Sequence, residues 1–250
     1  MQPVRRFVLP STLVVIPALN EEATVGSVVT AVLTHLGSDV LVVDDGSSDR
    51  TATVARKHGA QVIQHPFNLG VGAALRSGFR FAAERGYQAV VQVDADGQHD
   101  PAEALRLLAR LGDDELDLVI GSRFDAGYRV GRGRRAVMRL LSREVSRRLG
   151  VRVSDTTSGF RAFGPRAIDR FARAYPSAYL SDTVEALLLA GDWHLRVAEE
   201  PVVMHPRAGG RASSGPARSV LHLIRLVLVI ALHSVRRPIA ERGFVGDVEA

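Results

Sequence analysis

Two aspartates near the middle of the chain follow a short apolar segment and are separated by a single alanine. Asp94 and Asp96 come directly after residues 89–93, and Gln98 stands two positions further on. Because side chains alternate between the two sides of an extended chain, all three are expected to converge on one side. Two carboxylates this close repel each other unless a cation lies between them, and an all-oxygen ligand set suits Mg²⁺ or Mn²⁺. The alternative is a turn whose aspartates are solvated.

Polar clusters also follow the first two apolar segments of the chain. Residues 17–22 read PALNEE and residues 44–49 read DDGSSD. The carboxyl ends of adjacent parallel strands lie at one edge of a sheet, which is where ligands of such folds bind. Both clusters together therefore favour a nucleoside site, in which a carboxylate hydrogen-bonds the base or the ribose. Taken singly, Asn20 and Asp49 are equally well explained as helix caps.

Short apolar segments alternate with amphipathic ones over the first half of the chain. Bounded, β-branched runs predict buried strands at 13–16, 40–43, 61–63, 89–93 and 118–120. Apolar residues at three- and four-residue spacing predict helices at 22–36, 50–58, 71–85 and 101–111. Asp49 and Asp100 mark two of the helix starts. The alternation predicts an α/β fold with a mostly parallel central sheet, whose ligand lies outside the carboxyl ends of the strands.

The chain changes character after residue 121. Glycine and arginine are concentrated in residues 122–135, which predicts a mobile basic loop. Apolar residues then recur at helical spacing as far as Leu149. Arginines stand four residues apart on the other side of that predicted helix, namely Arg135, Arg139, Arg143 and Arg147. This arginine stripe is either a solvated face or a surface for lipid or phosphate.

The C-terminal part predicts one more loop and one more helix. Residues 206–217 are rich in glycine and serine, and residues 218–237 have the pattern of one amphipathic helix. We therefore expect a domain over residues 1–217 and a C-terminal amphipathic helix and tail over residues 218–250. No apolar run reaches the 18 residues or more that a helix needs to span a bilayer alone. The helix can instead lie in the headgroup plane or pack on protein.

The composition is that of a globular domain, since 46% of the 250 residues are hydrophobic and 24% are charged. The absence of cysteine excludes disulfides, thiolate metal sites and a cysteine nucleophile. The net charge is +5 and is almost entirely arginine, because Lys57 is the only lysine. Arginine forks suit phosphate oxygens and anionic lipid headgroups. Aromatic residues make up only 6% of the chain, which leaves few stacking platforms and disfavours nucleic acid as a partner.

Six motifs follow one another along the chain: PALNEE, VDDGSSDRT, NLGVGAAL, DADGQHD, GSR and DTTSGFRAF. Together they resemble the family-2 glycosyltransferases of the GT-A fold, and among these most closely the dolichyl- or polyprenyl-phosphate sugar synthases. The resemblance covers roughly residues 12–215 and implies a single, Rossmann-like GT-A domain. It implies a nucleoside pocket lined by Pro17, Leu19, Glu21, Val43 and Asp45, and a metal on the donor diphosphate held by Asp94, Asp96 and Gln98.

The resemblance also places arginines near phosphate groups. Arg123 of the GSR motif, Arg135 and Arg207 match positions where the family has arginines close to the donor or acceptor phosphate. Beyond Arg207 the chain departs from the family pattern, since residues 209–213 read GGRAS. Asp182 lies where other members of the superfamily carry a catalytic base. Its simpler role is to cap the helix expected over residues 183–190.

The chemistry of sugar transfer agrees with these residue types. The leaving nucleotide diphosphate carries negative charge, which a divalent ion on Asp96 and the guanidinium of Arg123 can stabilise. A lipid phosphate monoester, with its second pKa at about 6, is largely anionic at neutral pH and needs no general base. A hydroxyl acceptor does need one, and Asp182 is the candidate. The resemblance implies inversion at the anomeric carbon by a single displacement.

These observations lead to one expected function and two alternatives. We expect an inverting glycosyltransferase that uses a GDP- or UDP-linked sugar and a polyprenyl phosphate. It is expected to be cytoplasmic and peripheral on the cytoplasmic face of the membrane, docked by the helix over residues 218–237 and by the arginine stripe. The first alternative is a transferase of the same fold that acts on a soluble hydroxyl acceptor with Asp182 as general base. The second is a non-catalytic basic protein that binds polyanions.

Overall fold

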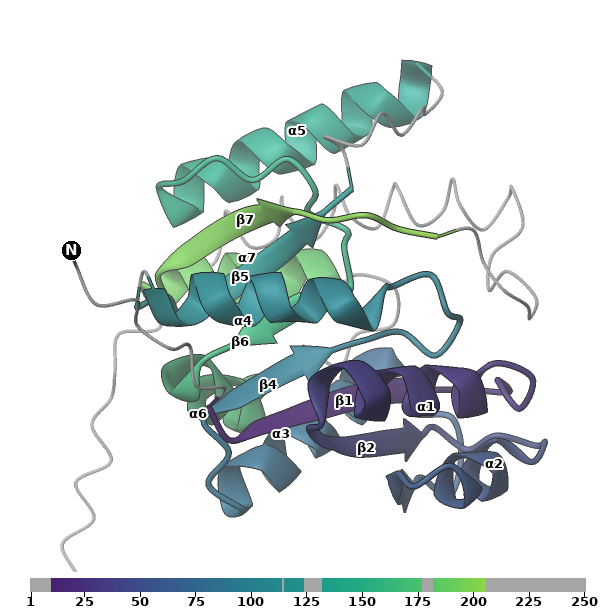
Figure 1. Cartoon of the computed structure of the whole chain (residues 1–250). Helices are drawn as coiled ribbons and strands as arrows, with labels where there is room; N and C mark the ends of the chain where they lie inside the picture. Colours follow the sequence, from purple (N-terminus) through teal and green to yellow (C-terminus); the bar gives the residue numbers. More distant parts are fainter. Residues whose placement is uncertain (1–9, 114, 124–131, 177–181, 206–250) are drawn as a thin grey trace, which may run out of the picture.

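The computed structural model describes residues 10–113, 115–123, 132–176 and 182–205 (Figure 1). Its strands are β1 (Thr12–Ala18), β2 (Asp39–Asp44), β3 (Gln61–Gln64), β4 (Ala89–Gln92), β5 (Leu118–Ser122), β6 (Arg161–Phe163) and β7 (Val197–Pro201). Its helices are α1 (Val25–Leu36), α2 (Thr51–Lys57), α3 (Val71–Glu84), the 3₁₀ turn η1 (Pro101–Glu103), α4 (Ala104–Asp113), α5 (Arg132–Leu149), α6 (Pro165–Ala174) and α7 (Asp182–Asp192). Strands and helices thus alternate along most of the chain, as the sequence predicts.

The strands form one mostly parallel sheet, which confirms the predicted fold class. The order is β3-β2-β1-β4-β6-β5-β7. β1 runs parallel to β2 and β4, β2 to β3, and β5 to β7. Among the described strands only β6 is antiparallel to its neighbours, β4 and β5. The carboxyl ends of the parallel strands and the beginning of β6 therefore meet at one edge of the sheet.

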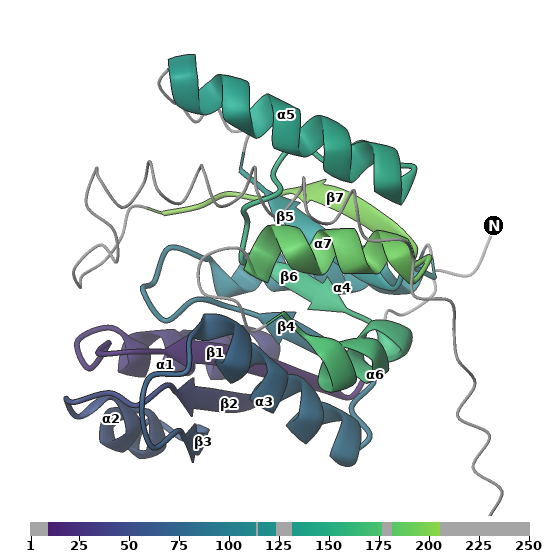
Figure 2. The same cartoon turned by 180° about the vertical axis from the view of Figure 1, so that it is seen from behind.

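Helices cover both faces of the sheet. α1 and α4 lie over one face, and α3, α6 and α7 lie over the other (Figures 1 and 2). Successive residues of β1 enter different clusters of buried apolar side chains: Val15 packs in the cluster that holds Phe79 of α3, and Ile16 in the cluster that holds Val28 of α1 and Leu107 of α4. Because both faces are covered, the strands read as continuous apolar runs instead of alternating ones.

The structure corrects several boundaries that the sequence predicts. β4 ends at Gln92, and the chain turns at residues 95–96 instead of remaining extended. α5 begins at Arg132, so residues 132–135 of the predicted loop are helical. β6, α6 and β7 were not predicted. β6 has only three residues and begins with an arginine, and β7 contains two glutamates.

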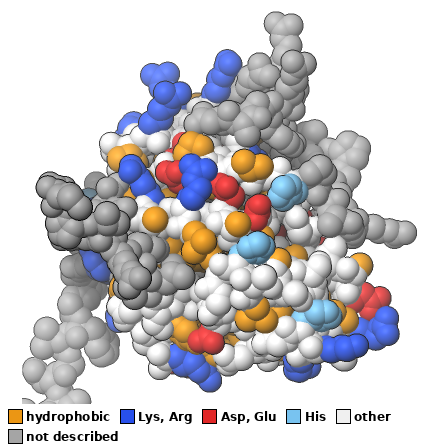
Figure 3. Space-filling model, in the orientation of Figure 1, with side chains coloured by type: hydrophobic (Ala, Val, Ile, Leu, Met, Phe, Trp, Pro, Cys, Tyr) orange, Lys and Arg blue, Asp and Glu red, His pale blue; other side chains and the backbone are white. Residues whose placement is uncertain are grey.

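The predicted membrane-docking elements are described only in part. Within the described ranges, no helix combines the length and the apolarity needed to cross a bilayer. The helix predicted over 218–237, and the domain boundary before residue 218, lie outside those ranges. Arg139, Arg143 and Arg147 are exposed on α5, and basic side chains project at the top of the view in Figure 3, where Figure 1 places α5.

The apolar face of α5 is narrower than the sequence indicates. Leu141 and Val145 are fully buried, as predicted. Leu140, which was predicted on the same face, is 55% exposed. In its described part, the helix therefore contacts the core along a narrow stripe that includes Met138, Leu141 and Val145.

Candidate active site

One edge of the sheet gathers most of the residues that the sequence singles out. β1, β2, β4 and β5 lead at this edge into residues 19–22, 45–49, 93–99 and Arg123, respectively. β6 runs antiparallel, so the segment before it, residues 155–160, begins at the same edge. Segments far apart in the sequence are thus brought to one place by the strand order.

The loops after β1 and β2 are joined by reciprocal hydrogen bonds. Asn20, which has a positive φ of 56°, accepts at Oδ1 from the backbone N–H of Ser48 at 2.9 Å and donates its own N–H to Ser47 Oγ at 2.9 Å. Asp49 Oδ2 accepts from the backbone N–H of Glu22 at 3.2 Å. Asn20 and Asp49 therefore hold the two loops in a fixed relation to each other.

Asp49 also marks the start of α2, as predicted, although the helix itself begins at Thr51. Its Oδ1 accepts from the backbone N–H of Thr51 at 2.9 Å. Burial by itself would raise the pKa of Asp49, but hydrogen bonds from Thr51 and from the Glu22 backbone outweigh it and lower the pKa below the usual 3.8. The carboxylate is therefore ionised at neutral pH.

The side chain of Asp45 forms hydrogen bonds with the loop that leads into α3. Only 4% of this residue is exposed. Its Oδ2 accepts from the backbone N–H of Gly70 at 2.7 Å, and its Oδ1 accepts from that of Leu69 at 3.0 Å and lies 2.7 Å from His65 Nδ1. His65 Nε2 lies 3.0 Å from Ser77 Oγ on α3. Asp45 thus anchors residues 65–70 beside the predicted nucleoside site.

The other residues predicted to line the nucleoside pocket have different surroundings. Pro17 and Glu21 are half-buried, and Leu19 is 37% exposed, so all three retain surface at the edge of the sheet. Val43 has no exposed surface and packs in the core with Leu41. Val43 lies in a strand that is covered on both faces, and its predicted place in the pocket stays a prediction.

The segment after β4 is held as a turn by a histidine that the sequence analysis did not single out. His99 Nδ1 accepts from the backbone N–H of Asp94 at 3.0 Å, and the ring stacks on Phe160 with centroids 4.9 Å apart. Since Nδ1 accepts, the neutral ring carries its proton on Nε2, which lies 3.7 Å from Asp94 Oδ2. A buried aromatic ring therefore fixes the backbone of Asp94 and faces its carboxylate.

Asp94 and Asp96 differ in exposure. The side chain of Asp94 is 41% exposed, whereas Asp96 is only 8% exposed and accepts at Oδ1 from the backbone N–H of Gln98 at 3.0 Å. The expectation that these side chains converge by alternation along an extended strand is wrong, because the chain turns between them. The turn, and not the pleat of a strand, determines how the two side chains lie relative to each other. Gln98 in turn accepts at its backbone oxygen from the N–H of His205 at 2.9 Å.

Gly159 leaves space for the Asp94 carboxylate. A Cβ atom at this position would lie 3.0 Å from both Asp94 Oδ1 and Oδ2, and 3.2 Å from Gln92 Nε2. These distances are shorter than ordinary van der Waals contacts. A larger residue at this position would therefore require the Asp94 carboxylate to move.

The donor set of this turn fits a divalent cation that a substrate helps to ligate. Among the described residues, no three or more His, Asp or Glu side chains are grouped as a complete metal site. Mg²⁺ in proteins is commonly held by one or two carboxylates, with substrate phosphates and waters completing the shell. Asp94 and Asp96 supply two carboxylates of that kind, one of them exposed at the edge.

Arg123 is clamped by a buried carboxylate. Its Nε donates to Asp155 Oδ2 at 2.8 Å, and its NH2 donates to Asp155 Oδ1 at 3.4 Å and to Thr157 Oγ1 at 2.8 Å. Asp155 is fully buried, whereas 26% of the Arg123 side chain is exposed. The guanidinium is thus fixed in place with part of its surface at the edge of the sheet.

The structure does not describe the side chains of three predicted site residues. Arg135 falls in the first turns of α5 and Asp182 is the first residue of α7, but only their backbones are described. Arg207 lies outside the described residues. Their predicted contacts with phosphate, and the role of Asp182 as a base or a cap, stay predictions.

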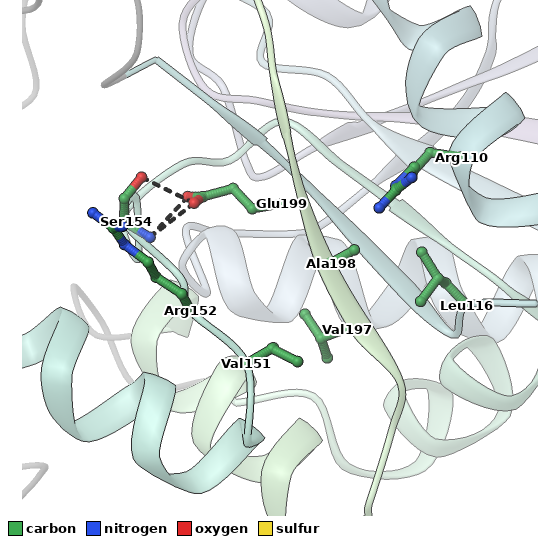
Figure 4. A pocket seen from close by; sticks show the side chains of 8 residues that line it. All are labelled: Arg110, Leu116, Val151, Arg152, Ser154, Val197, Ala198 and Glu199. Carbon is green, nitrogen blue, oxygen red and sulfur yellow. Dashed lines mark hydrogen bonds between the residues drawn. The ribbon is translucent and has the colours of Figure 1, made fainter. Parts of the chain in front are cut away.

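A pocket of about 530 Å³ lies beside β7 and holds none of the predicted site residues. Figure 4 shows the side chains that line it, which are Arg110, Leu116, Val151, Arg152, Ser154, Val197, Ala198 and Glu199. It is separate from the edge that carries Asp94 and Arg123, and we do not assign the chemistry to it. Its wall includes Glu199, whose carboxylate accepts from the backbone N–H of Asp155.

The functional residues that sequence reasoning missed are those that support the predicted ones. His99 and Asp155 belong to the motifs DADGQHD and DTTSGFRAF, so the motifs themselves were a signal for them. Glu199 lies 44 positions from its partner Asp155. No local pattern in the sequence indicates that pairing.

Comparison with known proteins gives the class of this one. The family model described as glycosyl transferase family 2 matches residues 13–172. This is more than half of the chain, and the chain therefore belongs to glycosyl transferase family 2. It is an enzyme of that class, as the motifs indicate, and the alternative of a non-catalytic polyanion-binding protein is set aside.

The names of two similar proteins include a polyprenyl-type substrate. Polyprenol monophosphomannose synthase of Mycolicibacterium smegmatis is 38% identical over 170 residues, which are 64% of this chain and 63% of that protein. UDP-N-acetylglucosamine--dolichyl-phosphate N-acetylglucosaminyltransferase of Methanococcus voltae is 28% identical over 215 residues, which are 75% of this chain and 83% of that protein. These similarities confirm the predicted resemblance to the polyprenyl-phosphate sugar synthases of the family.

The fold is shared with a solved enzyme. Glucosyl-3-phosphoglycerate synthase from Mycobacterium tuberculosis, in complex with Mn²⁺, UDP and phosphoglyceric acid, superposes with a TM-score of 0.69 over 91% of this chain and 80% of that chain. The sequence identity is 22%, so the likeness concerns the fold. It confirms the predicted GT-A architecture.

Proposed function

We propose that this protein moves a sugar from a nucleotide diphosphate to a polyprenyl phosphate, with inversion and with Mg²⁺ or Mn²⁺ on the donor. The observation that carries the proposal is the placement of the Asp94–Asp96 turn and the clamped Arg123 at one edge of the sheet. Two carboxylates and an arginine at the same edge suit a metal diphosphate: Asp94 and Asp96 would hold the cation, and Arg123 would bind phosphate charge.

The residues of the chain then have separate roles. Asp94 and Asp96 would hold the cation, which supplies charge stabilisation for the leaving diphosphate. Arg123 is already oriented by Asp155 in the free protein, so little reorganisation is needed when charge develops on the donor phosphates. The loops after β1 and β2, joined through Asn20 and Asp49, present Pro17, Leu19 and Glu21 toward the nucleoside.

The polyprenyl phosphate is favoured as acceptor by the two relatives whose names include such a substrate. A phosphate monoester that is already anionic attacks without a general base. The exposed arginines of α5 support a position at a membrane surface, where each basic side chain contributes about 1 kcal/mol against anionic lipid. We place the enzyme peripherally on the cytoplasmic face, with residues 218–237 as a second docking element.

A soluble acceptor is the second candidate. It is supported by the shared fold of glucosyl-3-phosphoglycerate synthase, whose complex contains the soluble phosphoglyceric acid. In that case a hydroxyl must lose a proton, and Asp182 at the start of α7 is the candidate base.

A transfer assay with GDP- and UDP-linked sugars, Mn²⁺ or Mg²⁺, and either polyprenyl phosphate or soluble acceptors tests both candidates. Asp96→Asn should lower transfer about 100-fold, because it removes a carboxylate that would hold the cation on the donor diphosphate. Glu103→Gln is a matched control, since Glu103 forms a surface ion pair with Arg106 at 3.1 Å. Transfer that does not require a metal, or an Asp96→Asn enzyme with full activity, would contradict the proposal.

Asp182→Asn separates the two acceptors. Transfer to a polyprenyl phosphate should persist in this variant, and transfer to a hydroxyl should be lost. Flotation with vesicles of anionic phospholipid tests the peripheral position: reversing Arg139 and Arg143 to glutamate should lower recovery with the vesicles. Equal recovery of the variant and the wild type would count against membrane docking through α5.

A further inference from the structure

We propose that Glu199 is a positioning residue that acts on Arg123 through Ser154 and Asp155. The inference deepens the proposed function and rests on Arg123 as a phosphate-binding group. Glu199 belongs to β7, at the margin of the sheet, and was not identified from the sequence. It lines a pocket that holds none of the predicted site residues.

We call the path from Glu199 through Ser154 and Asp155 to Arg123 the relay. Its first step joins Glu199 to the chain before β6. Glu199 Oε1 accepts from the backbone N–H of Asp155 at 2.7 Å. Its Oε2 accepts from the backbone N–H of Ser154 at 2.9 Å and from Ser154 Oγ at 2.9 Å. Figure 4 shows the Glu199 side chain turned toward Ser154. One carboxylate thus fixes two consecutive peptide N–H groups, and with them the direction in which the Asp155 side chain leaves the backbone.

The second step joins Asp155 to Arg123. The buried Asp155 carboxylate accepts from both Nε and NH2 of the guanidinium. A planar guanidinium held at two nitrogens has a defined plane and direction, unlike an arginine held at one. Asp155 Oδ1 also accepts from the backbone N–H of Thr157 at 3.2 Å and from its hydroxyl at 3.1 Å.

The relay closes on two paired strands. Glu199 pairs with Ile120 in the parallel β5–β7 ladder, and β5 ends at Ser122, directly before Arg123. The backbone on which Glu199 stands is therefore fixed to the strand that carries Arg123. The path from β7 through Ser154 and Asp155 back to Arg123 is a closed ring of hydrogen bonds and strand pairing. A change at Glu199 shifts the guanidinium without touching a ligand.

A neighbouring glutamate provides a matched control. Glu200 follows Glu199 on β7, but its carboxylate pairs with Arg106 of α4 at 2.8 Å, where half of the Arg106 side chain is exposed. Glu200→Gln and Glu199→Gln therefore make the same chemical change one residue apart. Only Glu199→Gln weakens the support of Asp155.

The experiment is a double-mutant cycle between Glu199 and Arg123, read as the affinity for UDP or GDP with Mn²⁺ and, in parallel, as kcat/KM for sugar transfer. Glu199→Gln should weaken both by about 10-fold in the wild-type background, since small displacements of a positioned group are costly. In the Arg123→Ala background the same change should have no further effect. Glu200→Gln should leave both values unchanged in either background.

Each outcome bears on a stated part of the proposal. A Glu199→Gln effect of equal size with and without Arg123, or no effect at all, would overturn the relay. Full nucleotide affinity and activity in Arg123→Ala would overturn it as well, because Arg123 would then not bind phosphate. If Glu199→Gln does not fold, Ser154→Ala removes one bond of the relay and should give a smaller effect that again depends on Arg123. A wild-type protein that binds metal–nucleotide but transfers no sugar refutes the proposed function alone, and the cycle is then read from affinity.

Discussion

The ring of His99 faces both the backbone N–H and the carboxylate of Asp94. Its Nδ1 accepts the Asp94 backbone N–H at 3.0 Å, and its Nε2 lies 3.7 Å from the Asp94 carboxylate. His99 itself is 4% exposed. The geometry of the candidate metal site thus depends on a buried residue that would not touch the metal.

Replacing His99 by alanine should lower stability and weaken metal dependence together. The backbone N–H of Asp94 loses its acceptor, which costs about 1–3 kcal/mol if the group stays buried. The carboxylate also loses its neighbour, so the Mn²⁺ concentration for half-maximal nucleotide binding should rise. Titration calorimetry with Mn²⁺ and nucleotide measures this. Phe160→Leu is the control, because it removes the stacked ring and keeps the hydrogen bond. If both variants lose stability and neither changes the Mn²⁺ dependence, His99 is only a packing residue.

Replacing Gly159 by alanine should displace the Asp94 carboxylate with little loss of stability. The added methyl group would meet both carboxylate oxygens at 3.0 Å, and a side chain of this kind can rotate away. We expect the half-saturating Mn²⁺ concentration to rise about 10-fold, in the range found when supporting residues of metal sites are changed. Gly164→Ala places a methyl group 3.2 Å from the backbone oxygen of Leu116 instead. It should affect the unfolding temperature and leave Mn²⁺ binding intact; a shift in Mn²⁺ binding there would undermine the interpretation.

Acid stability should depend on Glu144 of α5. Hydrogen bonding from Arg147, and then from Arg148, lowers the pKa of Glu144 from 4.5 to about 2. A carboxyl with a lowered folded-state pKa contributes stability above its unfolded pKa and loses it as the pH falls through the folded pKa. The contribution of Glu144 is therefore fully present above about pH 4.5 and lost toward pH 2. Thermal unfolding between pH 2 and 6 should show a flatter pH dependence for Glu144→Gln than for the wild type. Parallel curves would argue against this ion pair.

Truncation of Phe79 should destabilise the fold without a direct effect on the site. Phe79 is 1% exposed, and its ring lies 4.8 Å from that of Phe163 and 5.6 Å from that of Phe171. Phe79→Ala removes a large buried side chain and should cost about 3–5 kcal/mol in the free energy of unfolding. Urea denaturation followed by tryptophan fluorescence measures the loss, since Trp193 packs 5.2 Å from Phe171 in the same cluster. A cost below about 1 kcal/mol would show that this cluster repacks.

Elements whose signals are local could be predicted from the sequence. Continuous β-branched runs predicted β1, β2 and β5, and helical spacing predicted α1 and α3, because each pattern is complete within one segment. The order of short motifs was enough to indicate the family, since a motif records which residue types stand together and needs no fold to be recognised.

How the site residues are supported, and which of them reach the surface, depends on tertiary packing. Val43, which was predicted to line the nucleoside pocket, is buried, because its exposure depends on helices that pack on both faces of the sheet. Asp94 and Asp96 stand on a turn that His99 holds. Arg123 is held by the carboxylate of Asp155, which lies 32 positions away in the sequence. Glu199 and Asp155 meet only because β7 pairs with β5. Such contacts follow from strand order and packing, which depend on the whole chain and leave no periodic trace in any one segment.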